Sequence, residues 1–450
     1  MSAIMDDYDS ALSTDLYELT MAAAYFDNHE EADGTFELFV RSYPKNRSYL
    51  IAAGLQQAVD YLKDLRFEAR HIDFLKHHPN FKDVSNEFFK YLAQFRFSGD
   101  LWAMPEGTAF FTNEPVIRVT APIIEAQVIE TYLLSIINFE TLIATKASRV
   151  VHSARGRGVV EFGGRRAHGP ESALLAARAS YIGGCIGTSN VLAGYKYGIP
   201  TYGTVAHSFI MSYDSELEAF KRFGKTFPTT PAYLLDTYDT LEAARIVASL
   251  GVKPSLVRLD SGDRYTLSRK VRRILDEAGL KDTKIFVSGD LNEFVLDKLT
   301  ARKPPIDFFG VGTDLVTSRD DPALPGIYKL VSLTRNGTTT FRMKTSTGKQ
   351  TIPGAKQVHR LYRDGKIRED LITLEDEQPA TMTKPLLTNI MKSGQVVADM
   401  PSLDRIQEKA RNELSSLPTK YRKLYGTVKP PIRLSPRLVE LTNSLWKRTR

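Results

Sequence analysis

Short apolar runs alternate with segments of helical spacing through the middle of the chain. An apolar helix-like segment opens this region at Ile124–Phe139, and helical patterns follow at Leu241–Leu250, Ser268–Ala278 and Asn292–Leu299. The short runs have the length of buried strands: Val159–Phe162, Thr201–Gly203, Tyr233–Leu235, Leu256–Val257, Ile285–Val287 and Phe308–Phe309. Strands that alternate with helices predict a parallel α/β arrangement. Six such units favour an (α/β) barrel over an open sheet.

The two ends of the chain lack this rhythm. Thr35–Arg41 alternates like a strand, and Asp404–Leu414 has the spacing of an amphipathic helix. Asn336-Gly337 stands between the alternating runs Tyr328–Arg335 and Thr338–Lys344, which predicts a β-hairpin with a tight turn. These elements are typical of a mixed α+β domain.

No long low-complexity linker separates the three regions. We therefore expect residues 122–328 to form the barrel domain. Residues 1–121 and 329–450 should form a second α+β domain that packs beside it.

The charge balance adds little to this picture. The chain has 60 Lys and Arg residues against 53 Asp and Glu residues, a formal net charge of +7. The excess is spread along the sequence, with a small concentration at Lys447, Arg448 and Arg450. A phosphate-handling site and a solvated tail explain it better than a nucleic-acid stripe would.

Cys185 is the only cysteine, so an intramolecular disulfide and a Cys-rich zinc site are excluded. Its neighbours in Gly-Gly-Cys-Ile-Gly are small and apolar, which predicts a buried structural thiol. The first residues carry Asp6, Asp7 and Asp9 in place of an apolar signal segment, and no apolar run approaches transmembrane length. We expect a soluble, cytoplasmic protein.

Polar groups follow each predicted barrel strand, and this agreement is the strongest internal sign of an active site. Active groups of a barrel lie at the carboxyl ends of its strands. The groups in question are Thr204 and His207, Asp236, Arg258 to Asp263, Ser288 to Asp290, and Gly310 to Asp314.

Gly310-Val311-Gly312-Thr313 is a candidate phosphate loop. Its glycines would let backbone N–H groups approach a phosphate, and the Thr313 hydroxyl adds a donor. The alternative is a tight turn that needs positive φ, since short glycine patterns are common. Ser288-Gly289 on the preceding unit tips the balance towards phosphate binding.

The other candidates each have a structural alternative. Arg258 offers a planar fork for a carboxylate or phosphate, or it forms an ion pair with Asp260 or Asp263. Asp260 would accept from ribose hydroxyls or cap a helix. His207 is the best titratable candidate, with Asp236 to fix its tautomer, although a lone histidine is more often structural. Phe162 would stack on an aromatic ring or belong to the core, and the core is favoured from the residues alone.

Together these motifs resemble the nicotinate phosphoribosyltransferases, type II phosphoribosyltransferases of NAD salvage. The resemblance covers nearly the whole chain, and it rests on the order and spacing of the motifs. Its most specific parts are Glu161–Arg165, Gly187–Asn190, Gly203–Ser208, Val257–Asp263 and Phe309–Leu315.

The resemblance implies that nicotinate and phosphoribosyl pyrophosphate give nicotinate mononucleotide and pyrophosphate. It implies ATP as a co-substrate hydrolysed through a phosphohistidine, Mg2+ held largely by substrate phosphates, and a homodimer with shared active sites. The spread of the charge and the lack of a long apolar run lead us to expect neither nucleic acid nor a membrane as a partner.

The resemblance also implies residue roles. His207 would be the phosphohistidine, oriented by Asp236, and Arg258, Thr204 and Ser189 would line the nicotinate pocket. Stacking on the pyridine would come from Phe162 and from Tyr17 of the partner subunit, whereas Asp260 would bind the ribose. Phosphate and ribose contacts would come from Arg165, Gly289, Asp290, Gly312 and Thr313, and pyrophosphate contacts from Lys344 and Lys356.

Three alternatives remain. Nicotinamide phosphoribosyltransferases carry an aspartate at the position of Ser189, and an aspartate would repel the carboxylate of nicotinate. A serine can donate a hydrogen bond to that carboxylate, so Ser189 favours nicotinate. Quinolinate phosphoribosyltransferases are shorter and need extra basic groups. A non-catalytic barrel that binds phosphoribosyl ligands is disfavoured because His207, Asp236 and Arg258 are all present.

Overall fold

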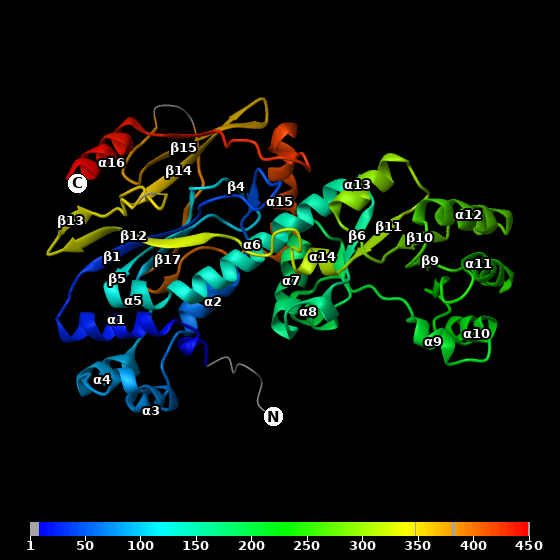
Figure 1. Ribbon diagram of the computed structural model, residues 1–450, viewed down its shortest axis with the longest axis horizontal. Helices are drawn as coiled ribbons and strands as arrows, with labels where there is room; N and C mark the ends of the chain where they lie inside the picture. Colours follow the sequence, from blue (N-terminus) through cyan, green and yellow to red (C-terminus); the bar gives the residue numbers. More distant parts are fainter. Residues whose placement is uncertain (1–8, 347, 380–382, 449–450) are drawn as a thin grey trace. The chain divides into compact units, whose positions relative to one another are not determined.

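The computed structural model describes residues 9–346, 348–379 and 383–448, so Asp6, Asp7 and Arg450 lie outside the described residues. The chain divides into two compact units (Figure 1). Unit 1 combines Met1–Thr141 with Ala323–Arg450, and unit 2 is Leu142–Pro322. The boundaries expected from the sequence fall at residues 121/122 and 328/329.

Unit 2 is built on one parallel sheet, drawn teal to yellow in Figure 1. In the described residues it has six strands in the order β7-β6-β11-β10-β9-β8. The strands are β6 (Gly158–Glu161), β7 (Gly187–Thr188), β8 (Ala232–Leu234), β9 (Leu256–Leu259), β10 (Lys284–Val287) and β11 (Phe308–Val311). The expected α/β class with an irregular barrel is confirmed.

Helices follow these strands in the chain, as the βα rhythm predicts. They are α7 (Pro170–Ile182), α8 (Val191–Tyr197), α9 (His207–Met211), α10 (Glu216–Thr226), α11 (Thr240–Ser249), α12 (Arg264–Glu277), α13 (Glu293–Ala301) and α14 (Thr313–Val316). Strand residues such as Val257, Ile285 and Phe309 pack in one core with helix residues such as Val247 and Leu275. Cys185 is buried in this core, as expected.

The strand predicted at Thr201–Gly203 is wrong. Thr201 forms only an isolated parallel bridge with Thr188, and the strand at this edge is β7. A Cβ on Gly187 would clash with the Pro200 carbonyl oxygen, so glycine permits this close approach. The apolar pattern missed β7 because its two residues, Gly and Thr, carry no apolar signal.

Unit 1 joins both ends of the chain in shared sheets. In the described residues, a seven-stranded antiparallel sheet has the order β13-β12-β1-β5-β3-β17-β18. Its strands are β1 (Asp33–Val40), β3 (Asp100–Ala103), β5 (Pro115–Pro122), β12 (Gly326–Arg335), β13 (Thr338–Phe341), β17 (Thr388–Lys392) and β18 (Gln395–Val396). The expectation that the N- and C-terminal segments build one α+β domain is confirmed.

Smaller sheets and helices complete unit 1. The sheets contain β14 (Lys356–Arg363), β15 (Lys366–Leu374), β16 (Lys384–Pro385) and β19 (Ile432–Leu434), and separately β2 (Leu50–Ile51) with β4 (Ala109–Phe110). The helices are α1 (Leu16–Asp27), α2 (Leu55–Asp64), α3 (Ala69–His77), α4 (Asn86–Gln94), α5 (Ile123–Val128), α15 (Leu403–Ser416) and α16 (Pro436–Arg448). Helix α6 (Glu130–Ser153) contributes residues to both units.

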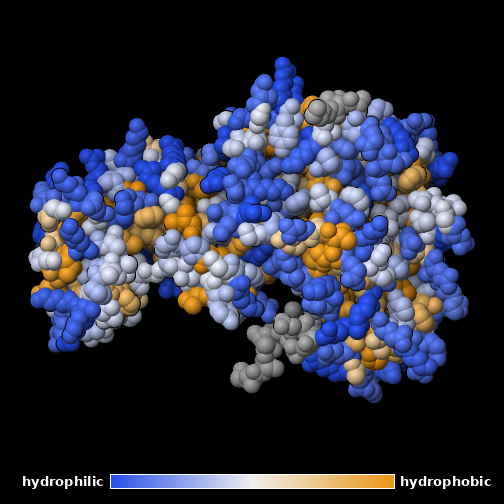
Figure 2. Space-filling model, turned by 180° about the vertical axis from the view of Figure 1, so that it is seen from behind, coloured by the Kyte–Doolittle hydropathy of each residue, from blue (hydrophilic) through white to orange (hydrophobic). Residues whose placement is uncertain are grey.

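The predicted hairpin is present as β12 and β13. Asn336 and Gly337 have φ values of 50° and 74°, the left-handed pair of a type I′ turn. No helix in the described part of the chain is both long and apolar enough to cross a bilayer. Hydrophilic side chains cover most of the face in Figure 2, with hydrophobic ones in separate patches.

Glu18 in the first turn of α1 is an unusual buried carboxyl group. It is 0% exposed, and the hydroxyls of Thr14 and Thr131 donate to it. Burial raises the pKa of Glu18 to about 7. Its neighbour Tyr17 is 48% exposed, so the two adjacent side chains point into different environments.

Glu18→Gln should remove a pH-dependent loss of stability. In the unfolded chain this carboxyl ionises near pH 4.5, whereas in the folded protein it stays protonated to about 7. The wild type should therefore lose stability as the pH rises between these values, and Glu18→Gln should not. Thermal unfolding from pH 4 to 8 measures this, with the exposed Glu87→Gln of α4 as the control. Parallel curves for wild type and Glu18→Gln would contradict the assignment.

Candidate functional site

The polar residues at the strand ends of unit 2 form one connected site. Along β9, Val257 and Leu259 point into the core, so the alternation places Arg258 and Asp260 on the other face. Strand β10 runs parallel to β9 with Val287 opposite Leu259. Ser288 therefore lies next to Asp260.

Arg258 is held by three side chains at once. Its Nη2 donates to Asp260 Oδ1 at 2.7 Å, its Nε to Ser288 Oγ at 2.8 Å and its Nη1 to Thr204 Oγ1 at 3.1 Å. Ser288 Oγ also donates to Asp260 Oδ1 at 2.5 Å. The ion pair with Asp260 that was considered from the sequence is thus present. It holds the guanidinium at the strand ends, where 15% of the Arg258 side chain is exposed.

This network sets the ionisation of Asp260. Burial acts to raise its pKa, but the hydrogen bond from Ser288 and the charge of Arg258 outweigh it and hold the pKa below the usual range. Asp260 is therefore an acceptor at neutral pH. It can receive hydrogen bonds from hydroxyl groups of a ligand.

Phe162 follows β6 and lies beside this network. It is half-buried, its ring centroid is 5.2 Å from that of Phe286, and the Arg258 guanidinium lies 5.8 Å from its centroid. Gly310 makes room for both rings, because a Cβ there would lie 2.8 Å from Phe286 and 2.9 Å from Phe162. Phe162 is thus neither a core residue nor a surface residue.

His207 begins α9 and is 42% exposed. Its Nδ1 is 3.2 Å from Thr237 Oγ1, and its Nε2 is 3.9 Å from Asp260 Oδ2. Asp236 does not fill the orienting role expected of it, since its Oδ2 accepts from the backbone N–H of Asp260 at 3.1 Å and from Ser261 Oγ at 2.5 Å. The carboxylate that faces the imidazole is Asp260, because that of Asp236 is bound to the neighbouring strand end.

Asp236 Oδ1 is buried and has no hydrogen-bond partner among the described residues. A carboxylate oxygen of this kind suits a hard divalent cation such as Mg2+. No group of three or more His, Cys, Asp or Glu side chains in the described residues could hold a metal by itself. Substrate phosphates would have to supply the remaining oxygens.

The two glycine loops differ in backbone conformation. Gly289 has φ +81°. Gly312 has φ −114° and caps α14 at its N-terminus, so the alternative of a turn with positive φ at Gly312 is wrong. A Cβ on Gly312 would lie 3.1 Å from the Phe162 carbonyl oxygen, so a larger residue would be crowded at this position.

Gly289→Ala is expected to destabilise unit 2 by more than about 2 kcal/mol. Its Cβ would combine a strained φ with a clash against the carbonyl oxygen of Asp260. Gly251→Ala is the matched control, because Gly251 has φ +68° but no atom within 4 Å of its Cβ. Denaturant unfolding of both variants separates the clash from the strain. Equal losses would mean that the contact with Asp260 is unimportant.

The remaining predicted residues of unit 2 follow the other strands of the sheet. Ser189, Arg165 and Asp290 are exposed, and Asp290 adopts a φ of 43°. Thr313 is half-buried as the first residue of α14. Their side chains remain candidates for binding, each at the carboxyl end of a strand.

Tyr17, Lys344 and Lys356 belong to unit 1. Lys344 is exposed. Lys356 is 3% exposed, and its Nζ contacts Glu37 Oε2 at 2.7 Å and donates to the carbonyls of Ile352 and Gly354 at 2.8 Å each. These partners engage all three ammonium hydrogens, so the expected pyrophosphate contact from Lys356 is replaced by a structural role.

Sequence reasoning missed Thr237 and Phe286 as site residues, and it missed the side-chain contacts of Ser288. Ser288 stood out only as part of a glycine loop, and its two hydrogen bonds depend on the register between β9 and β10. Thr237 follows Asp236 directly, and Phe286 lies within strand β10. Neither side chain carries a charge or belongs to a motif that would mark it as a site residue.

Family models match three successive parts of the chain. Residues 12–138 match the nicotinate phosphoribosyltransferase (NAPRTase) N-terminal domain, and residues 379–442 match the C-terminal domain of the same family. Residues 143–319, which nearly coincide with unit 2, match the quinolinate phosphoribosyl transferase C-terminal domain. Unit 2 thus matches a domain named for quinolinate phosphoribosyl transferase, and the segments on either side of it match the nicotinate phosphoribosyltransferase domains.

Similar proteins extend over almost the full length. The nicotinate phosphoribosyltransferase pncB2 of Mycobacterium tuberculosis is 45% identical, covering 95% of this chain and 92% of its own. Nicotinate phosphoribosyltransferase of Bacillus subtilis is 37% identical, with coverages of 95% and 94%. The human nicotinate phosphoribosyltransferase is 30% identical, with 96% of each chain covered.

Solved structures agree with this assignment. Human nicotinic acid phosphoribosyltransferase superimposes with a TM-score of 0.86 at 28% identity, over 96% of this chain and 99% of that one. The nicotinate-nucleotide pyrophosphorylase of Pyrococcus furiosus gives a TM-score of 0.74 at 25% identity, with coverages of 92% and 97%. The chain belongs to the nicotinate phosphoribosyltransferase family.

Proposed function

We propose that this protein transfers the phosphoribosyl group of phosphoribosyl pyrophosphate to nicotinate, giving nicotinate mononucleotide and pyrophosphate for NAD biosynthesis. Membership of the family supports this reaction. The single observation that carries it at the site is Arg258, a guanidinium anchored by Asp260, Ser288 and Thr204 beside the Phe162 ring.

Nicotinate offers a carboxylate and a flat ring for recognition. Arg258 supplies the cation for the carboxylate, and Phe162 supplies an aromatic face. Ser189 would donate to the same carboxylate. Hydrogen bonds to Asp260, Ser288 and Thr204 hold the Arg258 guanidinium in place.

The transfer moves the phosphoribosyl group between two partners. The lone pair of the pyridine nitrogen forms a bond to ribose C1 while the bond from C1 to the pyrophosphate oxygen breaks and its electrons leave with pyrophosphate. The ionised Asp260 would accept from the ribose hydroxyls and hold C1 in line. The loops at Gly289-Asp290 and Gly312-Thr313 would bind the 5′-phosphate through backbone N–H groups, with Arg165 adding charge.

Mg2+ would neutralise the pyrophosphate when bound. Asp236 would hold it through Oδ1, the buried oxygen that lacks a partner among the described residues. Lys344, an exposed cation of unit 1, is the remaining candidate for a pyrophosphate contact.

We propose further that ATP phosphorylates His207. The Asp260 carboxylate faces Nε2 at 3.9 Å and favours the proton there, which leaves the Nδ1 lone pair to attack the γ-phosphorus of ATP as ADP departs. Thr237, now 3.2 Å from Nδ1, would have to turn away. Phosphorus NMR of the acid-labile product should identify Nδ1-phosphohistidine, and the Nε2 isomer would contradict this tautomer.

A homodimer with shared active sites is also proposed. Tyr17 is 48% exposed, which suits an aromatic side chain that covers the site of a partner. Helix α8 begins two residues after Ser189 and exposes Val191 by 77% and Tyr195 by 87%. Apolar side chains gathered at such a place are typical of an interface. Sedimentation should give a dimer at active concentrations, and a fully active monomer would refute the shared site.

The function is tested by base selectivity. Pyrophosphate release from phosphoribosyl pyrophosphate and Mg2+ should be at least about 100-fold more efficient with nicotinate than with nicotinamide. Ser189→Asp should reduce the use of nicotinate by like-charge repulsion, whereas Ser189→Ala should have a smaller effect. Preference for nicotinamide would favour the nicotinamide enzyme, and release with neither base would favour a non-catalytic ligand-binding barrel.

A further inference from the structure

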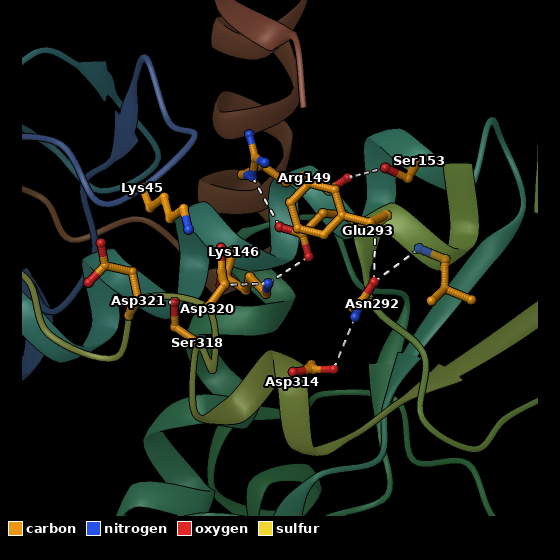
Figure 3. A network of polar contacts seen from close by, with 12 residues as sticks. Lys45, Lys146, Arg149, Ser153, Asn292, Glu293, Asp314, Ser318, Asp320 and Asp321 are labelled. Carbon is orange, nitrogen blue, oxygen red and sulfur yellow. Dashed lines mark hydrogen bonds and ion pairs between the residues drawn. The ribbon is translucent and has the colours of Figure 1, made fainter. Parts of the chain in front are cut away.

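One side chain links the two proposed phosphate loops. Asn292 follows the Ser288-Gly289-Asp290 loop and caps α13: its Oδ1 accepts from the backbone N–H groups of Phe294 at 3.1 Å and Val295 at 3.0 Å. Its Nδ2 donates to Asp314 Oδ2 at 3.1 Å (Figure 3). Asp314 directly follows Gly312 and Thr313.

The contacts of Asn292 fix the orientation of its amide. Backbone N–H groups need an acceptor, so the oxygen must face α13, and the nitrogen must then face the Asp314 carboxylate. An aspartate at position 292 would cap the helix as well as an asparagine does, but it could not donate to Asp314. The choice of asparagine is therefore explained by the link and not by the cap.

A buried ionic network ties the same two segments together a second time. Glu293, the first residue of α13, contacts Lys146 at 2.6 Å and Arg149 at 3.2 Å, and these side chains are at most 1% exposed. Lys146 also contacts Asp320, beyond α14, at 2.8 Å. Figure 3 shows Lys146 between Glu293 and Asp320. Lys146 therefore joins the start of α13 to the segment that follows α14.

We propose that Asn292 and Asp314 are positioning residues that set the spacing between the two phosphate loops. This inference rests on the proposed function, because it assumes that both loops bind one phosphoribosyl phosphate group. Neither side chain needs to touch the substrate. The buried network anchors the base of each loop, and the Asn292–Asp314 hydrogen bond fixes the loops close to the ligand.

The pair allows a test by reciprocal exchange. Asn292→Asp should bring two carboxylates face to face and weaken binding of ribose 5-phosphate about tenfold. Asp314→Asn alone should change binding less than about threefold, since the introduced amide can still accept through its oxygen. The double variant should recover binding, because the amide then at position 314 can donate to the carboxylate then at position 292. Such a pattern requires direct contact between the two side chains.

Calorimetry with ribose 5-phosphate is the primary measurement, and it does not depend on turnover. In kinetic assays Asn292→Asp should raise the KM for phosphoribosyl pyrophosphate about tenfold while the KM for nicotinate stays within about twofold. Asn292→Ser keeps a helix cap without adding charge, and it should show the weakened binding if Asn292→Asp does not fold. Asp297→Asn, an exposed exchange on the same helix, is the matched control.

The outcomes separate this inference from the proposed function. If the wild type binds ribose 5-phosphate and Asn292→Asp and Asn292→Ser bind it equally well, the positioning role is overturned while the function stands. Failure of the double variant to recover binding overturns the pairing. If the folded wild type neither binds ribose 5-phosphate nor releases pyrophosphate, both the function and this inference are overturned.

Discussion

The His207→Ala variant is expected to lose all stimulation of product formation by ATP and all acid-labile label from γ-labelled ATP. The imidazole is the nucleophile in the proposed phosphorylation, and no second histidine is assigned to the site. A slow ATP-independent reaction should survive, because Arg258, Phe162 and the phosphate loops remain. Product formation with and without ATP, together with label retained on the protein, measures both effects.

The control for this experiment is His168→Ala, which removes an exposed histidine from the same unit. It should keep the label and the ATP effect. His207→Glu is not a substitute for the phosphorylated state, because a carboxylate carries less charge and fewer acceptor oxygens than a phosphate. Label on the His207→Ala protein equal to that on wild type would remove His207 from the mechanism.

Arg258→Ala is expected to lower kcat/KM for nicotinate by two to three orders of magnitude, the equivalent of about 3–4 kcal/mol. The variant loses the cation for the substrate carboxylate. It also leaves Asp260 without its charged partner, so the pKa of Asp260 should rise and its carboxylate should face the substrate carboxylate uncompensated. Steady-state kinetics with nicotinate and with nicotinamide measure the loss.

Two comparisons make the Arg258 result specific. Arg258→Lys keeps the charge but loses the planar fork that reaches Asp260, Ser288 and Thr204, so it should recover only part of the activity. Arg245→Ala removes an exposed arginine that pairs with Glu242 on α11, and it should leave the kinetics unchanged. A loss of the same size for nicotinamide as for nicotinate would mean that Arg258 does not recognise the carboxylate.

Local patterns explain the elements that were predicted correctly. The strand residues of β8 to β11 form short apolar runs, and Asn336-Gly337 adopts the left-handed φ values that a tight hairpin needs. Helix α15 follows the amphipathic spacing of Asp404–Leu414. In each case the deciding interaction lies within a few residues, so the sequence contains the information directly. Strand β7 shows the limit, since its two residues carry no apolar signal and form a strand by pairing with β6, a separate segment of the chain.

The sequence by itself determined the α/β class, the α+β character of the two ends and the strand-end residues from which the site is made. Only the tertiary structure decided which of those residues meet. Asp260 faces His207 in place of Asp236, and Lys356 pairs with Glu37 although 319 residues separate them in the chain. The order of strands and their register bring these partners together. Such contacts depend on the packing of distant segments, which no local pattern encodes.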